Sequence, residues 1–546
     1  MKSHPAPVDL GPTFRMSQPT FSYGGAAINS LEKGLPKQVQ SLCPQCGRIV
    51  SATQFEQDER VFMRKDCPQC GGCNDLISSN AAFFLKMEQW TFGDNRGLVN
   101  PNVPGASKCP EQCGLCSLHT SHTGMGLVDL TNRCNLVCPV CFANANAKRP
   151  LYEPGLDQVR RMLQSLRDER PTPCRTIQFS GGEPTTYPTF HDAVRLARHL
   201  GFTHIQVATN GLLFAELAFA RRARDAGLHM LYLQFDGVGD EIYRRIRGRA
   251  LWAKKLQAIE NARLVGLDVV LVPTIARGVN DCEVGNIVRF ALANLDVVTG
   301  ISFQPITFSG RVASKRRQAM RYTIADLAMD VEQQTKLACA DEDWLPLACT
   351  APISRLISTI CGEEMPCYTC HPQCSAGTYL FVNPSTKQAV PVTRFLDFSG
   401  MLPDLELLCR TTNKTSFRLY RRVQAWNAIR KHFREQDAPA GLTFARFLQT
   451  LQRMTDKEYA RQELSGEQVR ESYPTLMVAG MHFMDSYNYD LDRVRRCIVH
   501  YAAPNGLIYP FCTYNSGPTY RKQIESEYSV RQLTQTIASL KGDAST

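Results

Sequence analysis

The sequence lacks any run of about 18 apolar residues, the length that a helix needs to cross a bilayer. Its first residues, MKSHPAPVDLGPTF, contain no basic segment followed by an apolar one, so we expect no secretory signal. It has no low-complexity tract, and apart from two CPQC units it has no internal repeat. These absences predict a cytoplasmic chain rather than a secreted or membrane-spanning one.

Cysteine, by contrast, is abundant. The 546 residues include 22 cysteines, which are gathered in clusters. A cytoplasmic chain rarely uses cysteine for structural disulfides, so thiolate ligation of metal is the expected use. The net charge of +11 favours an anionic partner, such as a phosphorylated metabolite, a membrane surface or nucleic acid, without choosing among them.

Short apolar segments alternate with helix-period segments over the middle of the chain. The expected strands are Gly126–Leu130, Thr176–Ser180, Thr203–Thr209, Met230–Phe235, Val269–Thr274 and Gly300–Gln304, and the expected helices include Asp157–Glu169, Phe190–Leu200, Leu217–Ala226 and Ala253–Val265. This alternation predicts an α/β fold with a parallel sheet covered by helices. Six strands fit an open (β/α)6 partial barrel and also a doubly wound sheet.

The cysteine clusters and the alternating region divide the chain into five predicted units. These are a lead-in (1–40), a rubredoxin-like or zinc-ribbon-like module (41–75), a connector with an auxiliary cluster motif (76–124), the core (125–325) and a C-terminal auxiliary Fe–S and substrate region (326–546).

The loop after the first expected strand carries the spacing C-x3-C-x2-C, formed by Cys134, Cys138 and Cys141. Three thiolates can hold three irons of a [4Fe–4S] cubane and leave the fourth iron open to a small molecule. The motif resembles that of radical S-adenosylmethionine (SAM) enzymes, in which SAM occupies this iron and is cleaved to a 5′-deoxyadenosyl radical. A structural zinc site or a closed cluster is the alternative for the triad alone.

Further candidates for binding SAM or substrate stand near the ends of the expected strands. Phe142 stands beside the triad. Ser180, Gly181, Gly182 and Glu183 form a segment similar to the radical SAM GGE motif. The other candidates are Asn210, Asp236, Thr274 and Gln304. Ligands of parallel sheets bind at the carboxyl ends of the strands, and glycine lets a backbone come close to a ligand. Taken singly, the polar residues are equally well explained as helix caps or turn residues.

One CPQC unit contains Cys43 and Cys46 and the other contains Cys67 and Cys70, with twenty residues between the two units. Paired C-x2-C knuckles predict a tetrahedral four-thiolate site for one metal ion. Both zinc and a single iron fit such a site.

The segment CPEQCGLC, with Cys109, Cys113 and Cys116, repeats the triad spacing but is not followed by a GGE turn. We therefore expect an auxiliary cluster here rather than a second SAM site. His119 and His122 are candidates for its fourth ligand, or are surface histidines.

The stretch Arg410–Arg434 contains eight Lys and Arg residues with aromatic residues between them. It predicts a basic amphipathic helix, which either contacts an anionic membrane or packs on the core with a solvated basic face.

Together these motifs resemble the radical SAM tetraether lipid synthases, which are also described as dihydropterin methylases. The resemblance covers about residues 40 to 515 and includes TNRCNLVCPVCFA, FSGGEPT, VATNGLL, HPQCSAGTYLFVN, MHFMDSYNYDLDRVRRC and HYAAPNGLIYPFCTYN. It implies a radical SAM partial (β/α)6 barrel, two auxiliary [4Fe–4S] clusters and one mononuclear iron or zinc. It assigns Cys109, Cys113 and Cys116 to one auxiliary cluster, and Cys349, Cys374, Cys497 and Cys512 to the other.

The chain departs from these relatives at His122-Thr123-Gly124-Met125, where many of them have a cysteine. The cluster at Cys109 therefore lacks a local fourth thiolate. Either a distant residue completes it, or one of its irons is open.

The resemblance implies abstraction of hydrogen from unactivated sp3 carbons and coupling or alkylation of lipid tails, which predicts a long apolar tunnel. Radical methylation of a pterin-like molecule is the first alternative and predicts a short polar pocket. Peptide maturation and an Fe–S regulatory protein are the others. The expected electron donor is a reductase with flavodoxin or ferredoxin. We expect no nucleic-acid partner, and we expect a cytoplasmic protein able to touch the inner face of the membrane.

Overall fold

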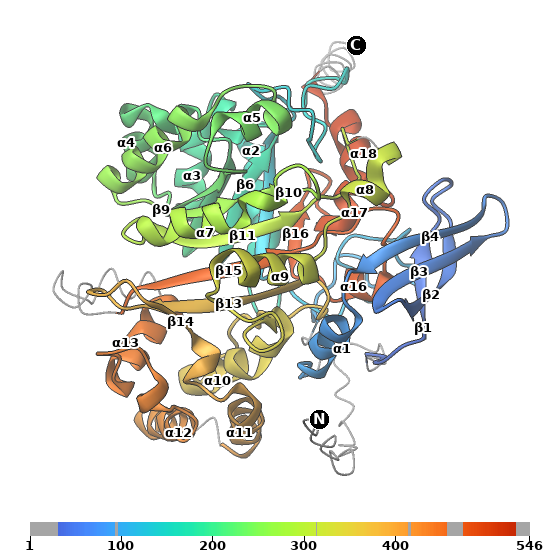
Figure 1. Cartoon of the computed structure of the whole chain (residues 1–546). Coiled ribbons are helices and arrows are strands. Elements are labelled where there is room, and N and C mark those ends of the chain that lie inside the picture. The colour runs from blue at the N-terminus through green and yellow to red at the C-terminus, as the bar shows by residue number, and fades with distance from the viewer. Residues whose placement is uncertain (1–30, 93–96, 313, 413–416, 456–472, 531–546) are drawn as a thin grey trace, which may run out of the picture.

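The computed structural model describes residues 31–92, 97–312, 314–412, 417–455 and 473–530. Figure 1 shows a small blue sheet at one side, a large mixed sheet through the centre, and a layer of helices below it. The predicted lead-in, residues 1–40, lies outside the described residues up to residue 30. Within the described ranges, no helix combines the length and apolar character needed to cross a bilayer.

The small sheet contains the two CPQC units. Its four strands are antiparallel neighbours in chain order: β1 (Lys37–Leu42), β2 (Ile49–Gln57), β3 (Arg60–Cys67) and β4 (Gly71–Ser78). The β2–β3 turn has Asp58 and Glu59 at positive φ, as a tight hairpin of right-handed twist requires. Helix α1 (Ala81–Gln89) follows, capped by the Asn80 side chain.

The central sheet confirms the six predicted strands. They are β5 (Met125–Thr131), β6 (Thr176–Gly181), β7 (His204–Thr209), β8 (Met230–Gln234), β9 (Asp268–Val272) and β11 (Val298–Pro305), with the short β10 (Thr274–Ile275) beside β11. All are parallel and pair in chain order. A doubly wound sheet would reverse its order partway, so the structure is the partial barrel.

Helices cover one face of this sheet. They are α2 (Leu156–Arg167), α3 (Phe190–His199), α4 (Leu217–Ala226), α5 (Asp240–Arg247), α6 (Trp252–Val265), α7 (Val284–Ala293) and α9 (Ile324–Thr335), with the single turn α8 (Arg317–Met320) before α9. Alternate strand residues such as Ile177, Phe179 and Val207 pack with Ala193 and Ala220 of the helices in one apolar core. The other face of the strands carries polar side chains such as Gln178 and Gln206.

Residues after 340 extend this sheet at both edges. Strand β15 (Thr475–Met481) pairs in parallel with β11, and β16 (Val499–Ala502) pairs in parallel with β5. Beyond them lie the antiparallel strands β12 (Leu345–Pro346), β13 (Ser375–Val382), β14 (Ala389–Pro391) and β17 (Ile508–Pro510). The short helices α16 (Leu491–Arg495), α17 (Phe511–Asn515) and α18 (Tyr520–Glu527) complete the C-terminal part.

The layer below the sheet contains α10 (Ala351–Cys361), α11 (Phe398–Thr411), α12 (Arg418–Arg430) and α13 (Phe444–Thr455). These helices share an apolar core of their own, which includes Leu356, Leu402 and Phe447. The basic stretch predicted over Arg410–Arg434 forms the end of α11 and all of α12.

Candidate active site

The loop after β5 carries the cysteine triad and is held by Asn146. The Cys134 N–H donates to Asn146 Oδ1 (2.9 Å), and Asn146 Nδ2 donates to the carbonyls of Cys134 (2.7 Å) and Leu136 (3.0 Å). Burial raises the pKa of Cys134 to about 12, and the nearby thiols of Cys138 and Cys141 act in the same direction. A thiol that resists ionisation and has two further thiols beside it suits a cationic iron centre, which stabilises thiolates.

The GGE segment at the end of β6 lies directly against this loop. Gly182 N–H donates to the Thr131 carbonyl (2.7 Å), and Glu183 N–H donates to the Arg133 carbonyl (2.8 Å). A Cβ on Gly181 would lie 2.2 Å from Thr131 O, and one on Gly182 would lie 2.1 Å from Arg133 O. The two glycines, which we expect to let the backbone come close to a ligand, therefore let it come close to the loop that carries the triad.

Glu183 fixes the end of the next strand, β7. Its Oε1 accepts hydrogen bonds from the hydroxyls of Thr185 (2.6 Å) and Thr209 (2.7 Å), and its Oε2 accepts the Asn210 N–H (2.7 Å). Burial raises the pKa of Glu183, although these hydrogen bonds oppose the shift. Asn210 in turn donates to Asn135 Oδ1 (2.6 Å) and lies 3.9 Å from the Cys134 sulfur.

Asp236, at the end of β8, is fully buried and paired with Arg247 at the end of α5. Its carboxylate also accepts the Thr274 N–H (3.0 Å), and Arg247 donates to the Thr274 hydroxyl (3.3 Å). Arg247 Nη1 reaches the Val140 carbonyl (3.1 Å), so these residues position the cluster loop. Burial raises the pKa of Cys138, and the Arg247 cation opposes that shift.

Ser180 and Phe142 join the loop and β6 to the C-terminal helices. Ser180 Oγ donates to Asp129 (2.7 Å), which pairs with Arg521 of α18. The Phe142 ring centroid lies 5.7 Å from that of Phe511 in α17.

Sequence reasoning missed Arg247 and Lys255. Lys255 of α6 is fully buried, and its Nζ donates to the Asn210 carbonyl (2.6 Å) and Gln234 Oε1 (2.8 Å). Burial lowers the pKa of Lys255 to about 7, while the Asp236 charge opposes the shift. A signal was present, because Lys255 stands three and seven residues before the buried Ala258 and Ala262 on the packed face of α6.

The strand face opposite the helices is rich in amides and hydroxyls. Gln206 Nε2 donates to Gln178 Oε1 (2.6 Å), Tyr232 OH donates to Ser302 Oγ (2.7 Å), and Gln304 Nε2 lies 3.4 Å from Tyr232 OH. A small apolar group, Met230, Val270 and Val272, packs beside Tyr232. Most of these groups can exchange hydrogen bonds with a polar ligand.

The CPQC units converge as predicted. The Sγ atoms of Cys43, Cys46, Cys67 and Cys70 all lie within 4.8 Å of one another, which fits four-thiolate tetrahedral ligation of one ion. Burial alone would raise the pKa of Cys43, but hydrogen bonds from the backbone of Cys46 and Gln45 bring it to about 7. Zinc and iron both fit this donor set.

The thiols of Cys109, Cys113 and Cys116 are also close enough to interact. Burial raises the pKa of Cys113 most, and the charges of Cys109 and Cys116 raise it further. The two histidines that follow have other partners. His119 Nε2 is 2.8 Å from the Cys497 carbonyl and 3.1 Å from His500 Nε2, and His122 Nε2 accepts the Cys367 N–H (3.1 Å).

A second group of buried thiols forms around Cys374. A hydrogen bond from Cys370 lowers its pKa to about 6, and Arg493 donates to its sulfur (3.4 Å). Cys497 and Cys512 are near enough to act on one another and on Cys374. Cys349 packs in the apolar core of the helical layer, and burial raises the pKa of its thiol to about 12. Cys370, which the resemblance does not assign, is the thiol that forms a hydrogen bond with Cys374.

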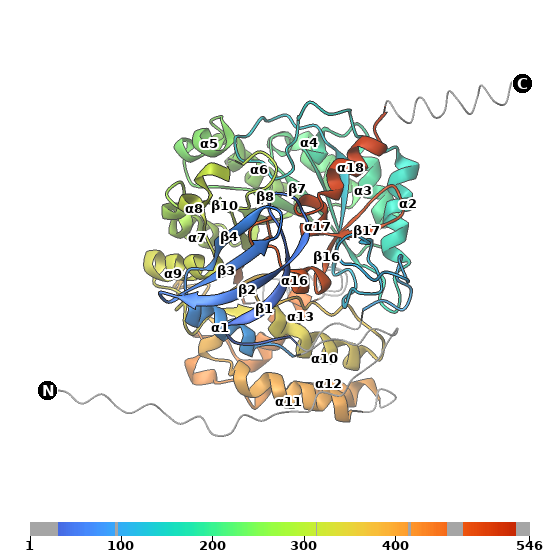
Figure 2. The same ribbon diagram turned by 90° about the vertical axis from the view of Figure 1, so that its right-hand side faces the viewer.

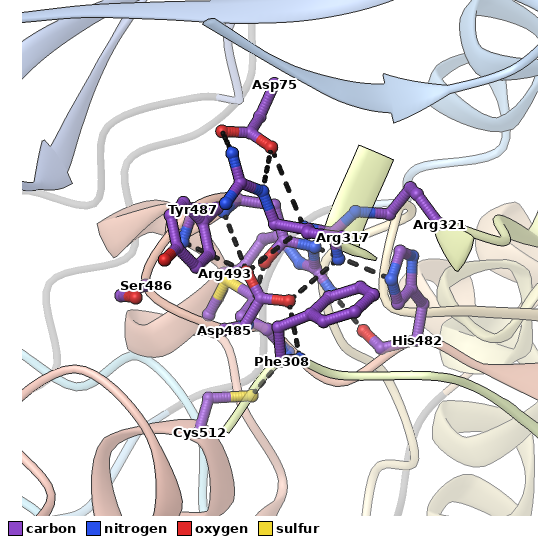
Figure 3. Close-up of polar contacts among 12 residues, drawn as sticks. Asp75, Phe308, Arg317, Arg321, His482, Asp485, Ser486, Tyr487, Arg493 and Cys512 are labelled. Atoms are coloured by element: carbon purple, nitrogen blue, oxygen red, sulfur yellow. Dashed lines mark hydrogen bonds and ion pairs between the residues drawn. The ribbon is translucent and has the colours of Figure 1, made fainter. Parts of the chain in front are cut away.

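Figure 3 shows the contacts that connect the small N-terminal sheet to this group of thiols. Asp75 of β4 pairs with Arg317 (2.7 Å), whose guanidinium lies 3.6 Å from the centre of the Tyr487 ring. The neighbouring Arg321 pairs with the buried Asp485 (2.7 Å), two residues before Tyr487. The same loop carries Met484, whose N–H donates to Cys512 Sγ (3.3 Å).

Comparison with known proteins gives this arrangement a family. Residues 128–291 match the radical SAM superfamily, and residues 35–79 match the HMPTM N-terminal zinc ribbon domain. The 7,8-dihydro-6-hydroxymethylpterin dimethyltransferase of Methanocaldococcus jannaschii is 38% identical over 499 residues, which are 91% of this chain and 96% of that protein. The chain belongs to the family of this dimethyltransferase.

Members of the superfamily with other activities match less of the chain. The probable GTP 3′,8-cyclase of Methanothermobacter marburgensis is 29% identical over 30% of this chain and 52% of its own. Among solved structures, Streptococcus suis SuiB bound to S-adenosylmethionine is 16% identical, with a TM-score of 0.33 over 46% of this chain and 52% of its own.

These comparisons confirm a radical SAM enzyme with an N-terminal metal ribbon. Radical SAM membership carries a [4Fe–4S] cluster and SAM as cofactors. The name of the M. jannaschii relative agrees with the pterin alternative better than with the lipid synthase interpretation.

Proposed function

We propose that this enzyme methylates a pterin-like small molecule by radical SAM chemistry. The similarity to the M. jannaschii dimethyltransferase carries the proposal, because it covers 91% of this chain rather than the radical SAM core alone. A likeness limited to the core would say nothing about the substrate.

The lining of the barrel supports a polar substrate. Five side chains of this face offer both donors and acceptors to the edge of a heterocycle: Gln178, Gln206, Tyr232, Ser302 and Gln304. Burying such groups against a hydrocarbon chain would leave the donors and acceptors that they do not use on one another without partners, which is costly. The lipid interpretation predicts an apolar tunnel, and this face is a poor lining for one.

Each element of the site has a role in this proposal. Cys134, Cys138 and Cys141 would hold the [4Fe–4S] cluster, which when bound would supply the electron for reductive cleavage of SAM. The GGE segment, Asn210, and the Asp236–Arg247 pair fix the cluster loop against the strand ends. Lys255 fixes the backbone at Asn210, which is the neighbour of the Cys134 sulfur.

We also propose that two auxiliary clusters are bound. One uses Cys109, Cys113 and Cys116. The other uses Cys370, Cys374, Cys497 and Cys512, with Arg493 offsetting thiolate charge. Burial raises the pKa of Cys497 and of Cys512, so these two thiols are costly to ionise unless a metal centre binds them.

The test is anaerobic turnover of the reconstituted full chain with 7,8-dihydro-6-hydroxymethylpterin, a reductant, deuteromethyl-labelled SAM and methylenetetrahydrofolate as a second one-carbon source. We expect 5′-deoxyadenosine together with a pterin whose mass has increased by methyl groups. The Cys138→Ala variant should give neither product.

Formation of 5′-deoxyadenosine with an unchanged pterin would contradict the substrate and leave the radical chemistry intact. No 5′-deoxyadenosine from a fully iron-loaded chain would contradict both. Tyr232→Phe should raise the KM for the pterin by about tenfold, the effect of one lost hydrogen bond, and leave the KM for SAM unchanged.

A further inference from the structure

Exposed apolar side chains are concentrated on one part of the surface. Six of the fourteen large exposed apolar side chains in the described part of the chain fall within residues 407–426: Leu407, Phe417, Leu419, Tyr420, Val423 and Trp426. Phe417 is 77% exposed and Leu407 is 61% exposed. Single exposed apolar residues are ordinary, whereas a contiguous group marks a contact surface.

Three of these residues form an apolar stripe along α12. Leu419, Val423 and Trp426 are spaced by four and three residues, so they share one face of the helix. The opposite face carries Ala425, which is buried in the core of the helical layer, and Ala428, which packs against it. The helix therefore turns small residues inward and large apolar ones toward solvent, the reverse of an ordinary surface helix.

The stripe lies in a strongly basic segment. Residues 407–434 contain eight Lys and Arg residues and no Asp or Glu. The Arg422 guanidinium lies 5.2 Å from the centre of the Trp426 ring, and Arg430 is one turn further along the same face. Neither arginine forms an ion pair with a carboxylate of the described residues.

Helices α11 and α12 pack against each other and run along the lower edge of the molecule in both views (Figures 1 and 2). Leu407 of α11 adds a further exposed apolar side chain to this edge. The edge belongs to the helical layer, below the central sheet that carries the radical SAM site.

We propose that this face of α11 and α12 docks on the surface of an anionic lipid bilayer. Leucine, valine and tryptophan suit the boundary between headgroups and acyl chains, and the arginines suit the lipid phosphates. Tryptophan and tyrosine are the aromatic residues that favour this interface. The inference goes beyond the proposed function and does not depend on the identity of the substrate.

Charge complementarity favours a bilayer over a second copy of the chain. A second copy would bring the same basic segment against this one, whereas an anionic bilayer neutralises it. Contact with an acidic protein would not need the large apolar side chains.

The test uses the full, iron-loaded chain and flotation with vesicles. Vesicles of phosphatidylcholine mixed equally with phosphatidylglycerol should bind at least about tenfold more protein than pure phosphatidylcholine vesicles, and added salt should weaken the binding. Trp344 is buried and Trp90 and Trp252 are partly buried, so a blue shift of the emission on anionic vesicles should come from Trp426.

The double variant Val423→Ser/Trp426→Ser should lose at least about tenfold in vesicle binding and keep its rate of 5′-deoxyadenosine formation. Leu264→Ser removes an apolar residue of α6 that is more exposed than Val423 or Trp426 and lies outside the surface proposed here, and this variant should bind as the natural chain does. The variant Arg422→Gln/Arg430→Gln should lose the preference for anionic lipid.

Absence of binding to anionic vesicles would overturn the proposal, and so would unchanged binding by Val423→Ser/Trp426→Ser. Sedimentation velocity tests the alternative that a second copy of the chain binds to this face. A dimer that dissociates in this double variant would assign the surface to a second copy of the chain and overturn the bilayer proposal.

Discussion

Arg247 connects Asp236 to the cluster loop. Its Nε and Nη2 donate to the two carboxylate oxygens of Asp236 at 2.7 and 2.8 Å, while its Nη1 donates to the Val140 carbonyl at 3.1 Å, one residue before Cys141. Because Asp236 is fully buried, this ion pair works in a medium of low polarity and holds the arginine in one orientation. A strand end thus determines where two of the three triad cysteines lie.

Replacing Asp236 by asparagine should loosen this connection. Removing one partner of a buried pair costs about 3–5 kcal/mol, because the other charge stays buried without compensation. We expect Asp236→Asn to retain less iron per chain and to form 5′-deoxyadenosine at least about tenfold more slowly. Glu241→Gln, an exposed change in α5, is the matched control. Normal iron content and rate in Asp236→Asn would refute this role.

Gly182→Ala tests the contact between the GGE segment and the loop. A Cβ there would stand 2.1 Å from the Arg133 carbonyl, a backbone atom that cannot move without moving the loop. We expect a loss of about 1–3 kcal/mol of unfolding free energy and failure to load the SAM cluster, measured by urea denaturation and by iron content. Gly105→Ala, where a Cβ would meet nothing within 4 Å, should behave as the natural chain does.

The ribbon offers a paired comparison of cysteines. Cys46→Ser removes one of the four converging thiols and should release the single ion, whereas Cys73→Ser changes a nearby thiol outside that group and should not. Elemental analysis of each purified variant measures the ion directly. Equal metal loss from both variants would mean that Cys73 shares in ligation.

Glu169 should give the stability of the protein a measurable pH dependence. Burial raises its pKa from 4.5 to about 8, while hydrogen bonds from Thr123 oppose the shift. The folded chain therefore keeps a proton that the unfolded chain has released. This group's contribution is most favourable below its unfolded pKa, and it declines as pH rises toward about 8, by up to about 1.4 kcal/mol per pH unit.

Glu169→Gln mimics the protonated carboxyl and should remove this decline. Urea denaturation of the iron-loaded chain at about pH 5.5 and about pH 7.5 should show a smaller difference for the variant than for the natural chain. Parallel behaviour of the two proteins would show that Glu169 is ionised in the folded state.

The sequence predicts features that local pattern determines. The radical SAM region, the convergence of the CPQC thiols and the strands β5 to β11 are confirmed because their spacing and periodicity fall within short windows. Features made by distant pairing are missed. Nothing near Val499 or Thr475 indicates that β16 and β15 would flank the core, since each pairs with a strand from another part of the chain.

Residue roles show the same limit. Glu183 and Asp236 are predicted to bind ligand from their places at strand ends, yet both use their carboxylate oxygens on neighbouring segments of the protein. Those partners lie 11 to 38 positions away along the chain and meet the carboxylates only after folding. The contact of Cys370 with Cys374 likewise depends on tertiary packing that no spacing rule describes.

The pairing of β16 with β5 also has a consequence for the order of synthesis. Strand β5 ends at Thr131 and its outer neighbour begins at Val499, so the ribosome must add about 370 residues before that edge can be covered. At roughly 5–20 residues per second this takes about 20–70 s, during which the edge is open to other chains. The nascent chain must therefore be kept from pairing with other chains through this edge while its sheet is unfinished.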